Sequence, residues 1–241
     1  GPMSRGLGDV YKRQVNKNVA GVSAMAMYKA ANPDFGFEIE IYKKIKPGSG
    51  VGSSSASAAG SVYGMNVLLG SPYSPLELTA FAIKGEAVAS QSEHADNIAP
   101  AIYGGFTLVK SLDPLEILQI PTPEDLFAVV IHPQIEIKTS DARKILPKDI
   151  PLKNAITQWS NVGSLIHGLH TNDYELISRS LVDVVVEPFR SQLIPGFESI
   201  KKAALEHGAL STGISGSGPS VFSLCNCLLY TSDAADDGTG V

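Results

Sequence analysis

The chain has 241 residues, 44% hydrophobic and 18% charged, with a formal net charge of −5. This composition is typical of a globular protein with a sizeable core, organised as one large or two small domains. The scattered Lys and Arg residues argue against nucleic-acid binding, because phosphate neutralisation needs clustered positive charge. No stretch approaches the roughly 18 consecutive apolar residues of a membrane-spanning helix, and the N-terminus lacks a signal-peptide pattern. We therefore expect a cytoplasmic protein with no nucleic-acid and no membrane partner.

Both ends of the chain have features of foreign sequence. Gly1-Pro2 resembles the remnant of a cleaved tag. Asp9–Gln14 can be encoded by GAT GTG TAT AAG AGA CAG, whose reverse complement, with one added base, encodes Cys227–Ser232 in another frame. This DNA element resembles a sequencing-library adaptor. We therefore expect residues 1–14 and 227–241 to be non-native, natural tails being the alternative.

The first part of the chain predicts helices around one strand and one loop. Apolar spacing indicates a helix over Asn18–Ala31, which the following Asn-Pro-Asp ends. Phe37–Tyr42 alternates apolar and acidic residues and predicts a half-buried strand. A glycine-rich loop over Pro47–Ser55 follows, and the apolar spacing from Ala58 to Leu69 indicates another helix.

The rest of the chain predicts further helices and strands in mixed order. Ser74–Glu77 has the pattern of a helix N-terminus with a capping box, and this helix carries Glu86. We then expect a turn into a strand over Ala99–Leu108 and a buried strand over Leu126–His132. Helical patterns cover 141–146, 154–169, 174–184 and 197–207, and a glycine-punctuated segment, 208–220, leads into a strand, 221–224. This mixture predicts an α+β fold, with a domain boundary near Thr122–Asp125.

The glycine-rich loop predicts a phosphate site. Gly48, Gly50 and Gly52 permit backbone conformations that other residues avoid, and the N–H groups that open the next helix favour an anion. Ser53–Ser55 add hydroxyls that can bind phosphate oxygens or a metal ion. No Lys follows the last glycine, which excludes a Walker A loop, and no suitably placed acidic residue supports dinucleotide binding. A purely structural glycine turn is the alternative.

Four segments resemble the motifs of the GHMP small-molecule kinases, a superfamily with galactokinase, homoserine and mevalonate branches. Pro47–Ala56 (PGSGVGSSSA) is similar to its phosphate loop, and Gly213–Phe222 (GISGSGPSVF) to its C-terminal glycine motif. His94–Pro100 (HADNIAP) and Thr139–Pro147 (TSDARKILP) resemble segments of the homoserine kinase branch. The likeness covers essentially all of residues 15–226.

The resemblance implies the GHMP kinase fold, with an N-terminal half like domain 2 of ribosomal protein S5 and a ferredoxin-like C-terminal half. It places the ATP-binding domain at 15–122, lacking its first strands, and the C-terminal domain at 123–226, lacking its end. The superfamily's first motif, Asn-Leu-Gly-x-Gly-x-Asp, is absent before the first helix. We therefore expect a fold that is incomplete at both ends.

The implied activity is ATP-dependent phosphorylation of the side-chain hydroxyl of L-homoserine to O-phospho-L-homoserine, in threonine biosynthesis. The alternatives are another GHMP small-molecule kinase, or a catalytically inactive nucleotide-binding fragment. L-homoserine is the expected small-molecule partner, and a homodimer is compatible with the resemblance.

The resemblance also implies site residues. The ATP-binding residues would be Pro47, Gly48, Ser49, Gly50, Val51, Gly52, Ser53, Ser54 and Ser55. Ser54 and Glu86 would hold Mg²⁺ and are the predicted catalytic residues, since a hydroxyl and one carboxylate leave positions for phosphate and water. The predicted substrate-binding residues are His94, Asn97, Thr139, Arg143, Arg190, Gly216 and Ser217.

Two of these assignments have ordinary alternatives. Arg143 and Arg190 would clamp the amino-acid carboxylate, a task suited to a planar bidentate donor. Without the family, Glu86 reads as a solvated helix residue, and Arg190 could instead pair with Glu187.

Overall fold

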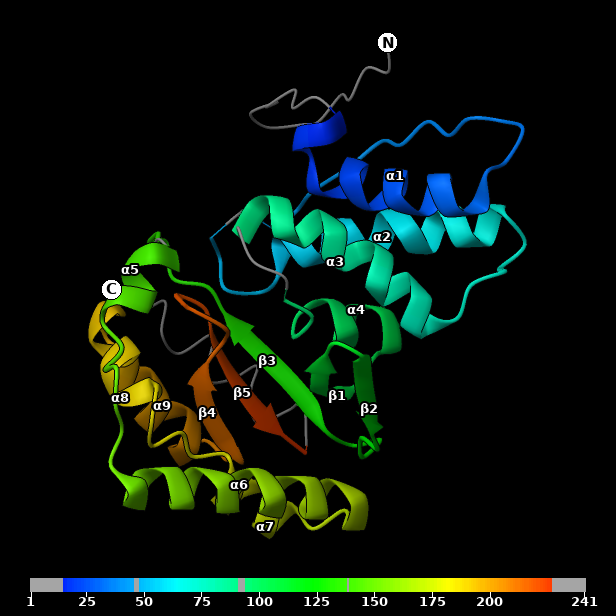
Figure 1. Cartoon of the computed structure of the whole chain (residues 1–241). Helices are drawn as coiled ribbons and strands as arrows, with labels where there is room; N and C mark the ends of the chain where they lie inside the picture. Colours follow the sequence, from blue (N-terminus) through cyan, green and yellow to red (C-terminus); the bar gives the residue numbers. More distant parts are fainter. Residues whose placement is uncertain (1–14, 46–47, 91–93, 138, 227–241) are drawn as a thin grey trace. The chain divides into compact units, whose positions relative to one another are not determined.

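The computed structural model describes residues 15–45, 48–90, 94–137 and 139–226 (Figure 1). They divide into two compact units, the first from the described parts of 1–47 and 52–120, the second from those of 48–51 and 121–241. The segments predicted to be non-native, 1–14 and 227–241, lie outside the described residues. Both units contain helices and strands, which confirms the α+β class.

The described residues of the first unit form four α-helices, one 3-10 helix and a hairpin. Its elements are η1 (Val15–Lys17), α1 (Val19–Ala31), α2 (Ser53–Leu68), α3 (Pro75–Ser90), α4 (Ile98–Tyr103), β1 (Phe106–Leu112) and β2 (Leu115–Ile120). Helices α1, α2 and α3 pack against one another in pairs, and the two strands form an antiparallel hairpin. Met27, Ala58, Val62 and Ile98 are fully buried in the core that these helices share.

The helix boundaries of this unit follow local sequence signals. The side chain of Asn18 accepts from the N–H groups of Ala20 and Gly21, which begins α1 as predicted. At the start of α3, Ser74 Oγ and the Ser74 N–H both donate to a Glu77 carboxylate oxygen, at 2.7 and 2.8 Å. The predicted capping box is thereby confirmed.

Two expectations in this unit are wrong. Residues 37–42 form no strand, although Phe37 and Ile39 do pack against the helical core. Alternation marks the side chains that are buried, but a strand also needs backbone partners, and no described strand pairs with this segment. The expected turn at Ala99 is instead the helix α4, and the strand begins only at Phe106.

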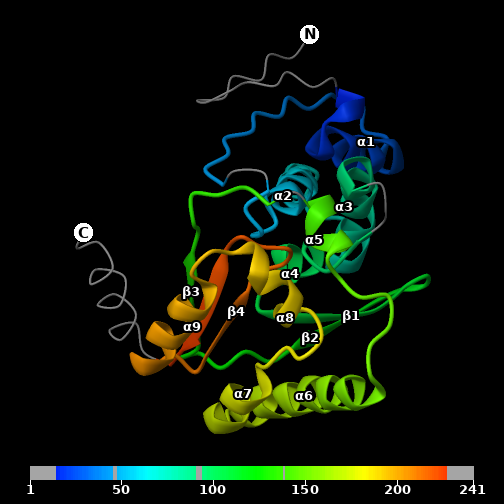
Figure 2. The ribbon, with the colours of Figure 1, turned by 90° about the vertical axis from the view of Figure 1, so that its left-hand side faces the viewer.

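The second unit is a three-stranded antiparallel sheet with helices. Its elements are β3 (Phe127–Ile131), α5 (Thr139–Lys144), α6 (Leu152–Thr171), α7 (Tyr174–Ser180), α8 (Glu187–Arg190), η2 (Ser191–Leu193), α9 (Phe197–Glu206), β4 (Ser211–Ile214) and β5 (Val221–Cys225). The strand order is β3-β5-β4, with Ile131 opposite Val221 and Ile214 opposite the same residue on the other side. Helices α8 and α9 contact β4, while α6 and α7 pack side by side (Figures 1 and 2).

The strand predicted at 126–132 is present as β3, but it is not buried. Val130 is 50% exposed and Ile131 40% exposed. Exposure alternates along most of β3, with Ala128 and Val130 exposed and Phe127 and Val129 half-buried, so one face of this strand is open. The predicted helices over 154–169, 174–184 and 197–207 are confirmed as α6, α7 and α9, with ends shifted by a few residues. Among the described helices, none combines the length and the apolar character that crossing a membrane requires.

Candidate functional site

The loop predicted to bind phosphate has an unusual backbone. Gly48, Gly50 and Gly52 have φ angles of 73°, 82° and 68°. Such angles favour glycine, and left-handed residues alternating with ordinary ones form concavities whose N–H groups bind anions. Gly48–Val51 belong to the second unit, whereas Gly52 belongs to the first. Pro47, the first predicted loop residue, lies outside the described residues.

Helix α2 begins directly after this loop. Its N-cap is Gly52, which has no side chain with which to cap the helix, and its first turn holds no acidic residue. The N–H groups of a first helical turn have no partner inside the helix, and the helix dipole adds positive potential there. The start of α2 therefore has the features of an anion-binding helix terminus.

The three serines of the first turn of α2 have different surroundings. Ser53 Oγ donates to the Ile45 carbonyl at 2.9 Å, and Ser55 is buried. Ser54 Oγ donates to Glu86 Oε2 at 2.5 Å, and both residues are half-buried. Glu86, on α3, is therefore held against α2 rather than solvated, and the structure brings together the two predicted metal ligands although 32 residues separate them.

The predicted substrate residues of the first unit lie between α3 and α4. His94 is half-buried, and Asn97 is the N-cap of α4. A Cβ built on Gly52 would lie 3.5 Å from Asn97 Cβ and 3.6 Å from its Oδ1. The Asn97 side chain is thus next to the start of α2.

The C-terminal glycine motif contacts the loop within the second unit. Residues 215–220 connect β4 to β5, and Ser215 Oγ donates to the Gly50 carbonyl at 2.8 Å. Ser220 Oγ donates to the Ser49 carbonyl at 2.5 Å. A Cβ on Gly50 would lie 2.6 Å from Ser215 O and 2.7 Å from Gly218 O, so only glycine fits at this contact.

The two predicted arginines lie on neighbouring short helices of the second unit. Arg143 is exposed on α5, the helix that Thr139 begins. Arg190, at the end of α8, donates through Nε to the Ala142 carbonyl at 3.3 Å and through Nη1 to the Gly216 carbonyl at 2.9 Å. Its guanidinium therefore connects α5 to the predicted substrate residue Gly216.

Burial and charge act on Arg190 together. Burial lowers the pKa of the Arg190 guanidinium, and the positive charge of Arg143 lowers it further, whereas Asp183 opposes the shift. Glu187 pairs with Lys201, not with Arg190. The arrangement favours an anion beside the two arginines, because an anion compensates their mutual repulsion.

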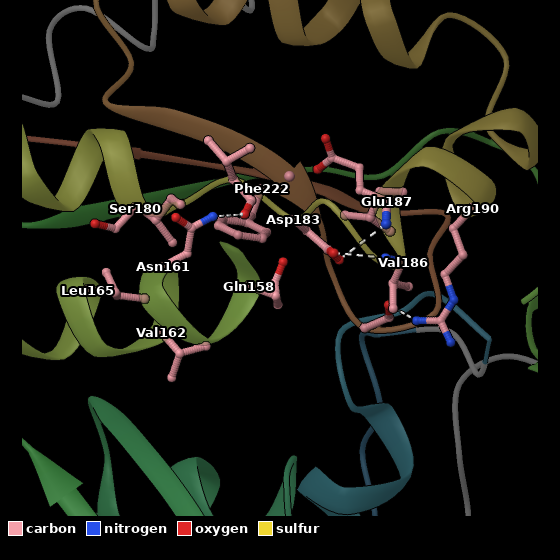
Figure 3. Close-up of a pocket in the computed structure, with 15 residues that line it drawn as sticks. Gln158, Asn161, Val162, Leu165, Ser180, Asp183, Val186, Glu187, Arg190 and Phe222 are labelled. Atoms are coloured by element: carbon pink, nitrogen blue, oxygen red, sulfur yellow. Dashed lines mark hydrogen bonds between the residues drawn. The ribbon is translucent and has the colours of Figure 1, made fainter. Parts of the chain in front are cut away.

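Arg190 and Gly216 line a pocket of about 350 Å³ in the second unit (Figure 3). Asp183, on the same wall, accepts hydrogen bonds from the N–H groups of Val185, Val186 and Glu187 and so fixes the start of α8. Asp183 is not among the predicted site residues, although an Asp that accepts from N–H groups two to four residues further on is a local pattern that could have indicated it.

Two models of known families match the chain: the GHMP kinases N terminal domain over residues 17–105 and the GHMP kinases C terminal over residues 165–236. Together with the loop and the fold, they define the class as a GHMP kinase.

Individual relatives narrow this class. The homoserine kinase of Methanococcus maripaludis (strain C5) is 45% identical over 213 residues, 87% of this chain and 69% of that protein. The homoserine kinase of Chlorobium phaeobacteroides (strain DSM 266) is 55% identical over 185 residues, 77% of this chain. The crystal structure of homoserine kinase from Cytophaga hutchinsonii matches with a TM-score of 0.92 at 46% identity, over 99% of this chain and 78% of that one. The chain belongs to the homoserine kinase family. It spans 58% of the length of the Chlorobium protein.

Proposed function

We propose that the chain transfers the γ-phosphoryl group of ATP to the side-chain hydroxyl of L-homoserine, giving O-phospho-L-homoserine for threonine biosynthesis. The hydrogen bond between Ser54 and Glu86 carries this proposal, because it joins a hydroxyl and a carboxylate at the end of the predicted phosphate loop. The names of the relatives supply the substrate.

The donor set of Ser54 and Glu86 fits Mg²⁺. Magnesium prefers oxygen ligands and keeps several waters, so it is often bound by one or two carboxylates together with substrate phosphates. Ser54 Oγ and Glu86 Oε2 lie 2.5 Å apart, and these two residues would hold the ion. When bound, the ion would neutralise charge on the phosphates.

The other predicted residues would position the two substrates. The loop N–H groups and the start of α2 would hold the phosphates, which suits a reaction that needs mainly positioning and charge neutralisation. Arg143 and Arg190 would bind the homoserine carboxylate, and His94, Asn97, Thr139, Gly216 and Ser217 are the other residues that we propose to bind substrate. We assign residues 15–122 to the ATP-binding domain and 123–226 to the C-terminal domain. The N-terminal family match, 17–105, lies within the first range, and the C-terminal match, 165–236, begins within the second and extends beyond it. The homodimer and the cytoplasmic location stay predictions.

The experiment is ATP consumption by this chain with Mg²⁺, in the presence and absence of L-homoserine. We expect turnover that depends on homoserine and not on mevalonate. Turnover with mevalonate instead would favour another GHMP branch. Binding of Mg-ATP without transfer to either acceptor would show an inactive nucleotide-binding fragment and contradict the proposal.

A further inference from the structure

The connection between β4 and β5 holds the phosphate loop through two successive carbonyl groups. Ser220 donates to the Ser49 carbonyl with both its hydroxyl, at 2.5 Å, and its N–H, at 3.3 Å. Ser215 Oγ donates to the next carbonyl, that of Gly50, at 2.8 Å. Ser49 and Ser220 are 3% and 0% exposed, so water cannot replace these contacts without an opening of the structure.

His132 contacts Ser220 because of the register of the sheet. Strands β3 and β5 are antiparallel with Ile131 opposite Val221, so the next residues outward, His132 and Ser220, face each other. His132 Nδ1 lies 3.0 Å from Ser220 Oγ. The histidine is half-buried and lies 88 residues from its partner in the sequence.

The hydrogen atoms of this contact can be assigned by counting donors. A serine hydroxyl has one proton, and a carbonyl oxygen can only accept. Two oxygens 2.5 Å apart need a proton between them, so the Ser220 hydroxyl proton points to the Ser49 carbonyl. The lone pair of Ser220 then faces His132, and Nδ1 must be the nitrogen that carries a hydrogen.

The direction of the Ser49 carbonyl also fixes the direction of an N–H group of the loop. In a planar trans peptide, the C=O of one residue and the N–H of the next point in opposite directions. The carbonyls of Ser49 and Gly50 point toward the connection between β4 and β5, so the N–H groups of Gly50 and Val51 point away from that connection. These are amides of the predicted phosphate-binding loop.

We propose that His132 is a positioning residue for phosphate binding. Its Nδ1–H donates to Ser220, whose hydroxyl donates to the Ser49 carbonyl and thereby directs the Gly50 N–H toward the phosphates. The identity of the ligand, Mg-ATP, rests on the proposed function, whereas the hydrogen bonds from His132 to Ser220 and from Ser220 to Ser49 do not depend on it. Both the neutral Nδ1–H tautomer and the imidazolium can make the contact.

The test compares four variants of the whole chain by two readouts. His132→Leu removes the donor, Ser220→Ala removes the hydroxyl, and His132→Asn keeps an N–H donor at the same branch position of the side chain. Thr212→Val is the matched control, because the Thr212 hydroxyl makes a buried hydrogen bond to Ser223, at 2.8 Å, in the same sheet and away from the loop. The first readout is hydrogen exchange of the Ser220 amide without nucleotide, and the second is the Kd of the magnesium complex of adenylyl imidodiphosphate.

We expect His132→Leu and Ser220→Ala to speed exchange of the backbone amide at position 220, relative to the intrinsic rate of each sequence, and to raise the Kd by about 2- to 13-fold, the effect of one hydrogen bond. His132→Asn should restore most of both values, and Thr212→Val should lower stability without raising the Kd. In turnover, KM for ATP should rise while kcat and KM for homoserine change less.

Three outcomes decide between the claims. Unchanged exchange in His132→Leu, or an equal effect in Thr212→Val, overturns the role of His132. A ring spectrum of ¹⁵N-labelled protein that shows hydrogen on Nε2 alone overturns it as well. If exchange responds as expected but the parent chain binds no nucleotide, the contact is supported and the proposed function fails.

Discussion

At the scale of single residues, the contact between Ser54 and Glu86 makes the sharpest prediction. Glu86→Gln keeps the size of the side chain but removes the charge that Mg²⁺ needs. We expect kcat/KM for Mg-ATP to fall by about 10- to 100-fold, the usual effect of losing an interaction with a charged group. The measurement is the initial rate as a function of Mg²⁺ concentration at fixed ATP.

The matched control for this prediction is Glu116→Gln, on β2. Glu116 pairs with Lys110 at 2.8 Å on the surface of the same unit. Glu116→Gln therefore makes the same change from carboxylate to amide at a position where the ion pair contributes little to stability. If the initial rates of Glu86→Gln and Glu116→Gln depend on Mg²⁺ concentration in the same way, Glu86 is not a ligand of the proposed metal site.

The two arginines have different surroundings, and we choose Arg143, whose side chain is exposed, for the test. Arg190 also donates to two carbonyls of its unit, so its removal would disturb structure as well as substrate binding. Arg143→Ala should raise KM for homoserine by about 10- to 100-fold, because a charge-assisted contact to the carboxylate is lost. KM for ATP should stay near the parent value.

Lys144→Ala is the control for Arg143→Ala. Lys144 follows Arg143 on α5, its side chain is 79% exposed, and its ammonium group lies at the long distance of 3.7 Å from Asp141 Oδ1. A rise of KM in both variants would show that positive charge near α5 matters in general and that Arg143 has no specific role.

At the scale of elements, helices α1 and α3 approach so closely that Gly85 has no room for a side chain. A Cβ on Gly85 would lie 2.0 Å from Ser23 Oγ and 2.3 Å from the Val19 carbonyl. Ser23 Oγ itself lies in the contact and reaches the Ala82 carbonyl of α3 at 3.2 Å. Gly85 directly precedes Glu86 in α3, so the packing of α3 against α1 also determines the position of Glu86, the predicted Mg²⁺ ligand.

Gly85→Ala should therefore destabilise the first unit although alanine favours helices. Overpacking costs about 1–3 kcal/mol, against a gain of about 1 kcal/mol in helix propensity. We expect a lower midpoint in urea denaturation. Gly64→Ala, on the exposed face of α2 with nothing within 4 Å, is the control and should stabilise. Adding Ser23→Ala to Gly85→Ala should recover only part of the loss, because the Val19 carbonyl remains.

At the scale of the whole molecule, the sequence predicted helices better than strands, for a physical reason. A helix such as α3 carries its own start signal, the capping box at Ser74. A strand needs a partner elsewhere in the chain, so residues 37–42 had the right alternation and no strand. Strand β4 has two polar residues and a glycine among its four, and it was missed because its signal lies in pairing with β5.

The same distinction holds for the candidate site. Gly50 and its neighbours were predicted because a phosphate loop is a local pattern. The role of Ser220 and His132 depends on the register of β3 and β5, which no local pattern contains. The residues proposed to act directly on a ligand were therefore accessible from motifs, whereas those proposed to position the loop required the structure.

The stability of the whole molecule should depend on pH through Glu187. This carboxylate pairs with Lys201, and their side chains are only 15% and 22% exposed. Burial raises the pKa of Glu187 above its ordinary 4.5, and the charges of Asp183 and Glu198 add to the shift, whereas Lys201 opposes it. The folded state therefore binds more protons than the unfolded state between 4.5 and the raised value.

The sign of the effect follows from this difference in bound protons. The contribution of Glu187 to the free energy of unfolding is fully present below the unfolded pKa and is lost as pH rises through the folded pKa. Glu187→Gln cannot ionise, so the free energy of the parent minus that of this variant should decrease as pH rises from about 4.5 toward 7. With Lys201→Met, the free energy of unfolding should decrease more as pH rises over this range, because the variant lacks the positive charge that lowers the pKa of Glu187. Urea denaturation across this range measures both slopes. A difference that grows with pH would mean that attraction to Lys201 outweighs the cost of burying the Glu187 charge.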